Sequence, residues 1–227
     1  MDGLTARRQR TAHPKFRRVA APAAALVGVN ILLMYLVAAT PLAVANDLLF
    51  QVPILGLLVY GAALTGGSIL AERGLESGSM ELAAVGVVLL QVAYALFGGG
   101  IIAGLGGGTR GVALGIAFVV TLAMTIGIAA YVYRRGGSYD HWGRWALGAF
   151  ILGALLVAVG SAIPAVLLGG FVAIFAGFTL RLGYEIWQVS ANYAPDKSLR
   201  HAVGIYVAFT GVFVHVLQIV ARQFLQE

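Results

Sequence analysis

The sequence predicts an all-α membrane protein with seven transmembrane helices, and three observations support this fold class. Hydrophobic residues make up 60% of the 227 residues and charged residues only 11%, whereas about a quarter of the residues in a soluble domain are charged. The mean hydropathy is +0.90. The apolar residues also form seven long runs, and a helix of about 20 such residues crosses the hydrocarbon core of a bilayer.

The seven runs define the expected elements. We place the spans near residues 19–45, 50–71, 81–105, 111–133, 145–160, 163–188 and 200–222. The runs lack the alternation of apolar and polar residues that is typical of membrane barrels, so their backbones must be satisfied as helices. Because only residues 161–164 separate the fifth and sixth spans, we expect a tight antiparallel hairpin there. The domain organisation is a basic segment, residues 1–18, followed by one transmembrane domain, residues 19–227.

The basic residues predict the orientation of these spans. If the spans alternate in direction, thirteen of the fifteen lysines and arginines fall on one side, and Arg110 and Arg222 fall on the other. The positive-inside rule then places the N-terminus in the cytoplasm and the C-terminus outside. We expect the basic N-terminal segment to lie against anionic lipid headgroups. The same distribution argues against a nucleic-acid partner, and the short loops without an organelle signal favour a prokaryotic plasma membrane.

Small and neutral polar residues predict how the helices pack. Glycine and alanine recur at four-residue spacing, which lets helix backbones approach closely in a membrane. These rows are Gly100, Gly104 and Gly108; Gly111 and Gly115; and Gly169, Ala173 and Gly177. For the neutral polar residues Asn30, Gln51, Gln91 and Gln218, we expect hydrogen bonds between helices.

Ionisable residues within the spans are the candidate functional residues, because such groups are costly in lipid. Glu185 lies near the cytoplasmic end of the sixth span, and Arg181 precedes it by one turn on the same helix face. A local ion pair and a role in gating or proton sensing are both open for this pair. His215 lies deep in the seventh span, where a hydrogen bond to a neighbouring helix is the expected state.

Other charged residues and the composition exclude several functions. We expect Glu72, Arg73, Glu76 and Glu81 to form a solvated loop, although Glu72 and Arg73 could reach Glu185 if their helices are neighbours. The chain has no cysteine, which excludes disulfides and zinc sites built on cysteine. We find no catalytic constellation and no pair of facing histidines for haem, so neither an enzyme nor a cofactor is expected.

The last two spans resemble the Bax inhibitor family, the calcium-leak proteins with a transmembrane Bax-inhibitor motif. That family's sixth helix ends in a pattern like G-F-x-L-x-x-D-T-Q. This chain reads Gly177-Phe178-Thr179-Leu180 and then Tyr184-Glu185-Ile186-Trp187-Gln188. The run from Ala202 to Leu217 is similar to the family's seventh helix, and the span count and basic connections agree over most of the chain.

The resemblance implies six helices in two three-helix layers around a central seventh helix. It also implies a pH-sensitive calcium or cation leak, in which carboxylates on the last two helices share a proton and an arginine of the second helix competes for one of them. Glu185 stands at the first carboxylate, but the second falls on Ala208, which cannot ionise. Arg73 is the nearest counterpart of the arginine. His215 shares a face with Ala208 and could supply the missing titratable group, a hypothesis that fails if His215→Leu leaves the pH profile unchanged.

These observations leave three classes of function. The first is a calcium or cation leak in which Glu185, with Arg181 or Arg73 as its ion partner, controls the path. The second is a non-conducting subunit or scaffold of a larger complex, which the small number of intramembrane charges favours. The third is a transporter of a small apolar or zwitterionic solute, which no sequence feature specifically favours. The sequence identifies neither the protein partners nor a metal site.

Overall fold

A computed structural model of the chain describes residues 12–160 and 163–226. This part is almost entirely helical and contains no strand. In chain order its elements are α2 (Ala12–Ala38), η1 (Pro41–Ala43), α3 (Val44–Phe50), α4 (Pro53–Ser77), α5 (Met80–Ile102), α6 (Gly107–Arg135), α7 (Asp140–Gly160), α8 (Pro164–Asn192), η2 (Pro195–Lys197) and α9 (Ser198–Gln226). Seven of these helices, all but the short α3, are long and apolar enough to cross a membrane, which confirms the predicted fold class.

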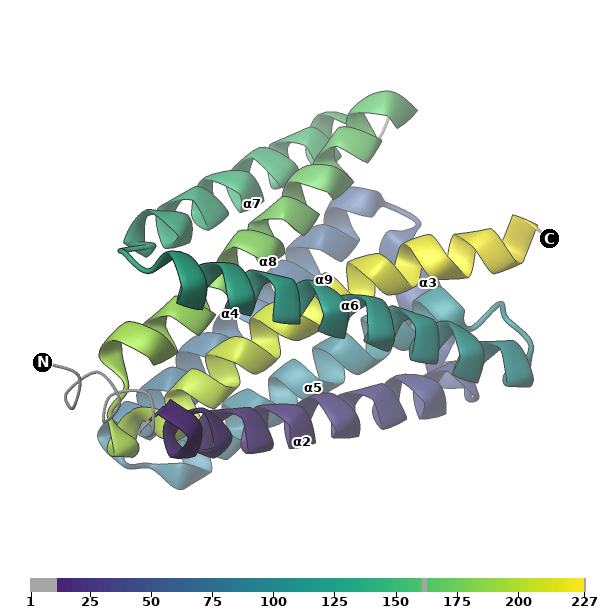
Figure 1. The fold of residues 1–227 in the computed structure, drawn as a ribbon. Helices are drawn as coiled ribbons and strands as arrows, with labels where there is room; N and C mark the ends of the chain where they lie inside the picture. The colour runs from purple at the N-terminus through teal and green to yellow at the C-terminus, as the bar shows by residue number, and fades with distance from the viewer. Residues whose placement is uncertain (1–11, 161–162, 227) are drawn as a thin grey trace, which may run out of the picture.

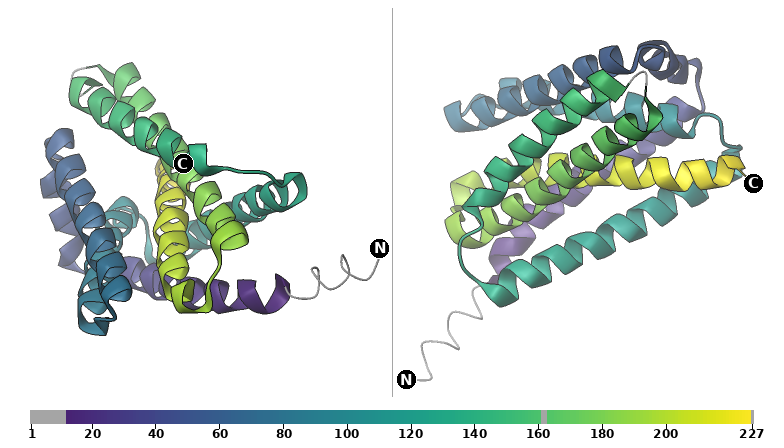
Figure 2. Two further views of the ribbon diagram at one scale, coloured as in Figure 1. Left: turned by 90° about the vertical axis from the view of Figure 1, so that its left-hand side faces the viewer. Right: turned by 90° about the horizontal axis from the view of Figure 1, so that it is seen from above.

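Helix α9 forms the centre of the bundle. Two-thirds (67%) of the residues in its most apolar stretch are buried, compared with 50% for α5 and 28% or less for the other spans. It packs against α2, α4 and α5 on one side and against α6 and α8 on the other, while α7 pairs with α8. Figure 2 shows α9, in yellow, between these two groups of helices. The arrangement of six helices around a central last helix is therefore confirmed.

Two helix pairs are joined through small residues. On α4, Gly67, Ala71 and Gly74 face Ala83 and Gly86 of α5, so that a Cβ on Gly86 would collide with the backbone of Ala71. On the hairpin of α7 and α8, glycines of the two helices lie backbone to backbone: a Cβ on Gly153 would lie 3.1 Å from the carbonyl oxygen of Gly170. Close packing without side chains between the helices is what holds membrane helices together where lipid supplies no hydrophobic drive.

The glycine rows that the sequence singled out have mixed outcomes. Gly100 lies against Asn46 and Gly177 against Phe150, so both are close contacts. A Cβ added to Gly108, Gly111 or Gly115 would meet no atom within 4 Å, so these three do not bring helices together within the described residues. The tightest approaches involve other glycines, because spacing alone does not show which face of a helix is turned to a neighbour.

The first connection differs from the expectation. The predicted span at 19–45 ends at Ala38, because Thr40 is extended and Pro41 starts a new 3-10 turn that leads into α3. Helix α4 then begins with Pro53 in its first turn, a position that tolerates the missing N–H. The predicted first span therefore ran too far, since its final residues belong to a separate short apolar segment, Pro41–Phe50.

The second connection is also a correction. Glu72, Arg73 and Glu76 do not form a solvated loop but lie on the last turns of α4, which continues to Ser77. The reversal takes two residues: Gly78 in the left-handed conformation (φ 76°) and Ser79, whose Oγ accepts a hydrogen bond from the N–H of Leu82. Glu81 follows in the first turn of α5.

The remaining turns fit the expected topology. The hairpin predicted at 161–164 connects α7 to α8, which begins at Pro164, and residues 161 and 162 lie outside the described part. Of the basic N-terminal segment, residues 1–11 lie outside it as well, and from Ala12 onward the chain is helical. Helix α2 begins at one end of the bundle, and α9 ends at the opposite end (Figure 1).

Candidate functional site

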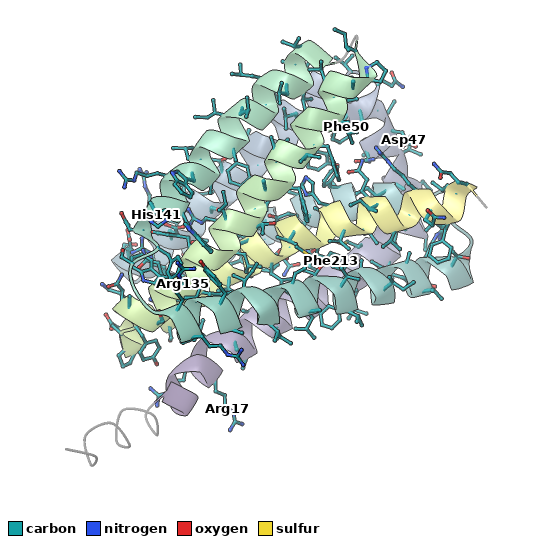
Figure 3. All side chains as sticks on the ribbon, turned by 45° about the horizontal axis from the view of Figure 1, so that its top comes forward. Arg17, Asp47, Phe50, Arg135, His141 and Phe213 are labelled. Carbon is teal, nitrogen blue, oxygen red and sulfur yellow. The ribbon has the colours of Figure 1, made fainter. Side chains whose placement is uncertain are left out.

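The candidate site lies at one end of the bundle, which we call the basic end. It contains the start of α2, the end of α4, the turn from α6 to α7 and the turn from α8 to α9. Figure 3 shows Arg17, Arg135 and His141 at this end and Asp47 and Phe50 at the other, with Phe213 between them. The sequence-predicted residues Arg73, Arg181 and Glu185 all lie toward the basic end because α4 and α8 both finish there.

Glu185 is the buried acid of the site. It lies on α8, two turns before the helix ends at Asn192, and among the described side chains it is the only buried carboxylate. Arg181 Nη2 lies 2.6 Å from Glu185 Oε1, and 39% of the arginine side chain is exposed, compared with 8% of the glutamate. The i, i+4 spacing therefore produces the expected ion pair, with the acid inside and the arginine reaching outward.

Glu185 also meets the central helix. Its carboxylate lies against Gly204 of α9, where a Cβ would be 2.5 Å from Oε2. A glycine at this point lets a charged group fit between α8 and α9, two helices that pack against each other. Gly204 thus provides the space into which the carboxylate fits.

A second ion cluster joins α9 to α4 at the same end. Arg200 Nη1 lies 2.7 Å from Glu76 Oε1, and its Nη2 lies 3.6 Å from Glu72 Oε2. Arg200 is one turn before Gly204, the residue against which the carboxylate of Glu185 lies. The ion pair of α8 and the cluster of α4 and α9 therefore lie close together at the ends of three helices.

Arg73 and Ala208, which the sequence analysis considered as counterparts of the family's site residues, lie outside the ion pair of Glu185. Arg73 is exposed on α4 and forms no salt bridge with any described residue, whereas Glu72, its neighbour in sequence, turns toward α9. Ala208 is fully buried on α9, one turn beyond Gly204. The residue of α9 that faces Glu185 is therefore Gly204, and the cation that bridges α4 and α9 is Arg200.

His215 lies in an aromatic environment away from Glu185. Its ring packs among Phe171, Phe175 and Phe178 of α8, with centroid distances of 5.0, 5.9 and 5.6 Å. Its Nδ1 lies 2.7 Å from the carbonyl oxygen of Gly211, so the ring bonds its own helix rather than a neighbouring one. His215 follows Gly204 by eleven positions on α9, a rise of roughly 16 Å.

Sequence reasoning missed Arg200 and Gly204 as parts of the site. The signal for Arg200 was present, since Glu72 and Glu76 are spaced i, i+4 and share a helix face that needs a cation. Gly204 had no such signal, because one glycine in an apolar helix looks like many others in this chain. No group of three His, Asp or Glu side chains suited to hold a metal ion occurs within the described ranges.

Comparison with known proteins adds the family. A family model described as "Inhibitor of apoptosis-promoting Bax1" matches residues 17–224, which cover six of the seven spans in full and the seventh as far as Phe224. The chain belongs to the Bax inhibitor family. No curated protein and no solved structure matches the chain.

Membership of the Bax inhibitor family agrees with the resemblance at the last two spans. This member of the family keeps an acid, Glu185, at the end of α8, and it has Ala208 where the resemblance places a second carboxylate. The ion partner of Glu185 among the described residues is Arg181 of its own helix, and the cluster at the junction of α4 and α9 lies at the same end of the bundle.

Proposed function

We propose that this protein is a pH-sensitive leak for calcium or another cation, with Glu185 in its gate. The observation that carries the proposal is the burial of Glu185 between α8 and α9 against Gly204, with Arg181 at 2.6 Å. A carboxylate in this position can bind and release a proton. Desolvation favours its neutral form and the neighbouring arginines favour its charged form, so a modest change in the network can shift the balance.

The proposed gate works through exchange of ion partners. Glu185 pairs with Arg181 on its own helix, and the charged groups of the neighbouring helices at this end are Arg200 on α9 and its partners Glu72 and Glu76 on α4. When Glu185 is ionised, it holds Arg181 and draws on Arg200, which keeps the ends of α4, α8 and α9 together. When Glu185 is protonated, these attractions weaken, and Arg200 is left to Glu72 and Glu76.

The proposed setting follows from the charge distribution. With the basic end in the cytoplasm, the N-terminus lies inside and the C-terminus outside, as the positive-inside rule requires. The N-terminal basic residues then lie near anionic headgroups of a prokaryotic plasma membrane. In this orientation the gate lies close to the cytoplasmic surface, where it would respond to cytoplasmic pH.

The experiment is calcium flux into liposomes that contain the purified protein, measured between pH 6 and 8. We expect a pH-dependent flux in the wild-type protein. Glu185→Gln is neutral at every pH, so its flux should be constant across the range and equal to the wild-type flux at the acidic limit. Glu81→Gln, an acid at the same end that is exposed at the start of α5, is the matched control and should keep the wild-type profile.

A second candidate function is a non-conducting subunit or scaffold of a larger complex. The observation that favours it is the scarcity of acids inside the bundle, since Glu185 is the single buried carboxylate among the described side chains. Folded protein that gives no flux above empty liposomes would support this alternative. A partner that co-purifies in fixed stoichiometry would support it further.

A further inference from the structure

Aromatic rings form a continuous ladder where α6 ends and α7 begins. Tyr131 contacts Tyr139 at 5.9 Å between ring centroids, Tyr139 contacts His141 at 6.4 Å, and His141 contacts Trp145 at 4.7 Å. Trp142 packs against this ladder, 4.8 Å from Tyr139. We call these five residues the aromatic corner. It belongs to the basic end but takes no part in the ion network of Glu185.

Three exposed arginines lie within a few residues of the aromatic corner in the sequence. Arg135 lies over the Tyr131 ring at 5.7 Å and donates a hydrogen bond from Nη1 to the Tyr131 hydroxyl at 3.2 Å. Arg134 precedes it, and Arg144 lies beside Trp145 on α7. No described residue forms a salt bridge with any of the three, and Asp140 is the one carboxylate in this turn. The corner therefore has a surplus of positive charge.

Tyr131 and Arg135 lie at different depths on α6, and Trp145 lies inside the end of α7. Tyr131 is one turn inside the end of α6, about 6 Å from the level of Arg135 at the helical rise of 1.5 Å per residue. Trp145 is five residues into α7, about 7.5 Å from its first residue. Trp145 is 59% exposed and Tyr131 is 43% exposed. Exposed rings at this depth are typical of the membrane interface. Arg135 lies farther out, and the long side chain of Arg144, one residue before Trp145, can reach toward the same level.

We propose that the aromatic corner binds an anionic phospholipid. Its phosphate would contact Arg135 and Arg144, its glycerol region would lie on the rings, and its acyl chains would follow the apolar surface of α7 and α6. That surface is available, since Leu147, Leu152 and Ile126 are each more than half exposed. The turn between the helices has four residues, Gly136 to Tyr139, and it is too short to cover the arginines. A lipid fits better than an acidic protein segment because the exposed rings lie within the spans.

The experiment uses tryptophan fluorescence, because all three tryptophans of the chain lie at the basic end. A variant with Trp142→Phe and Trp187→Phe, which keeps an aromatic ring at both positions, leaves Trp145 as the reporter on the lipid-facing side. The protein is reconstituted in phosphatidylcholine with a small fraction of brominated lipid, which quenches tryptophan on contact. We expect brominated phosphatidylglycerol to quench Trp145 several-fold more strongly than brominated phosphatidylcholine at the same fraction.

Variants in the same reporter background test the assignment of the arginines. Arg135→Gln with Arg144→Gln should remove the preference for the anionic lipid, and Arg135→Lys with Arg144→Lys should retain most of it. Arg222→Gln, an exposed arginine at the opposite end of the bundle, is the matched control and should leave the preference unchanged. Equal quenching by the two lipids, or a preference that survives the double glutamine variant, would overturn the proposal.

A further measurement separates a lipid from a free phosphate. If soluble glycerophosphate at millimolar concentration relieves the quenching, the corner binds phosphate from solution and the lipid proposal is wrong. If glycerophosphate has no effect while phosphatidylglycerol retains its preference, the lipid is the ligand. None of these measurements depends on ion flux, so their outcome is independent of the proposed leak.

Discussion

The carboxylate of Glu185 lies in a gap of α9 that exists because residue 204 is glycine. A Cβ there would be 2.5 Å from Glu185 Oε2 and 2.7 Å from its Cδ. The atoms in the way are the far end of a flexible side chain, so a substitution can displace the carboxylate without breaking the backbone packing. The structure thus offers a way to move the acid while its charge is retained.

Gly204→Ala should displace Glu185 from α9 and alter the pH profile of the flux. The methyl group takes the place of the carboxylate, which rotates toward solvent and Arg181, where ionisation is easier. We expect the midpoint of the profile to move toward acidic pH in the liposome assay. Gly148→Ala, at a glycine of α7 with no atom within 4 Å of a Cβ, is the control. An unchanged profile in Gly204→Ala would show that the contact with α9 is not part of the gate.

The charges of Arg200 and Glu76 should be exchangeable between the two positions. Arg200→Glu places three acids together at the junction of α4 and α9, and we expect a loss of stability and a higher flux at neutral pH. Combining it with Glu76→Arg restores one ion pair across the same two helices. Because both side chains are about half exposed, the recovery in unfolding free energy should be on the order of 0.2–1 kcal/mol. Thermal unfolding of the single and double variants in detergent gives this coupling.

If the double exchange is no more stable than Arg200→Glu alone, the contact in the structure contributes nothing to stability. Arg73→Glu is the matched control. Arg73 is an exposed arginine that lies between Glu72 and Glu76 on α4 and forms no salt bridge with a described residue. Its effect on stability and on flux should be smaller than that of Arg200→Glu.

The patterns that extend over the whole sequence predicted the fold well. Seven apolar runs and the asymmetry of the basic residues are averages over many positions, so errors at single residues do not change them. The hydrogen bonds expected of neutral polar residues are also confirmed for one pair: Asn30 Nδ2 donates to Gln91 Oε1 at 2.7 Å across α2 and α5. The end of the first span was wrong because apolar composition continues past Ala38 into Pro41–Phe50 although helix α2 does not. The end of the second was wrong for the opposite reason, because α4 continues to Ser77 although the apolar run stops at Ala71.

The site was predicted in part. The ion pair of Arg181 and Glu185 is local, since four residues of one helix determine it, and it appears as expected. Arg200 depends on which face of α4 meets α9, and this depends on the packing of Gly67, Gly74 and Gly86 between α4 and α5. The i, i+4 spacing of Glu72 and Glu76 indicates that a cation faces them but not which helix supplies it, so Arg73 was chosen on position alone.

Gly86→Ala should destabilise the bundle. Its Cβ would collide with the backbone of Ala71, which cannot rotate away as a side chain can, so α4 and α5 must separate. Overpacking of this kind costs about 1–3 kcal/mol. Gly66→Ala, at a helical glycine of α4 with open space around it, should be neutral or slightly stabilising because alanine favours the helix. Thermal unfolding in detergent measures both, and equal midpoints for the two variants would contradict the close contact.

His215→Leu should leave the pH profile of the flux in place, with Glu185→Gln as the reference variant that abolishes it. The hypothesis that His215 replaces the missing acid at Ala208 requires its protonation to reach the gate. The ring instead lies among Phe171, Phe175 and Phe178, bonded to the carbonyl of Gly211 and about three turns from Gly204. Leucine fits the same apolar surroundings, so the variant should fold. A profile that becomes flat in His215→Leu would assign the titration to the histidine and remove Glu185 from that role.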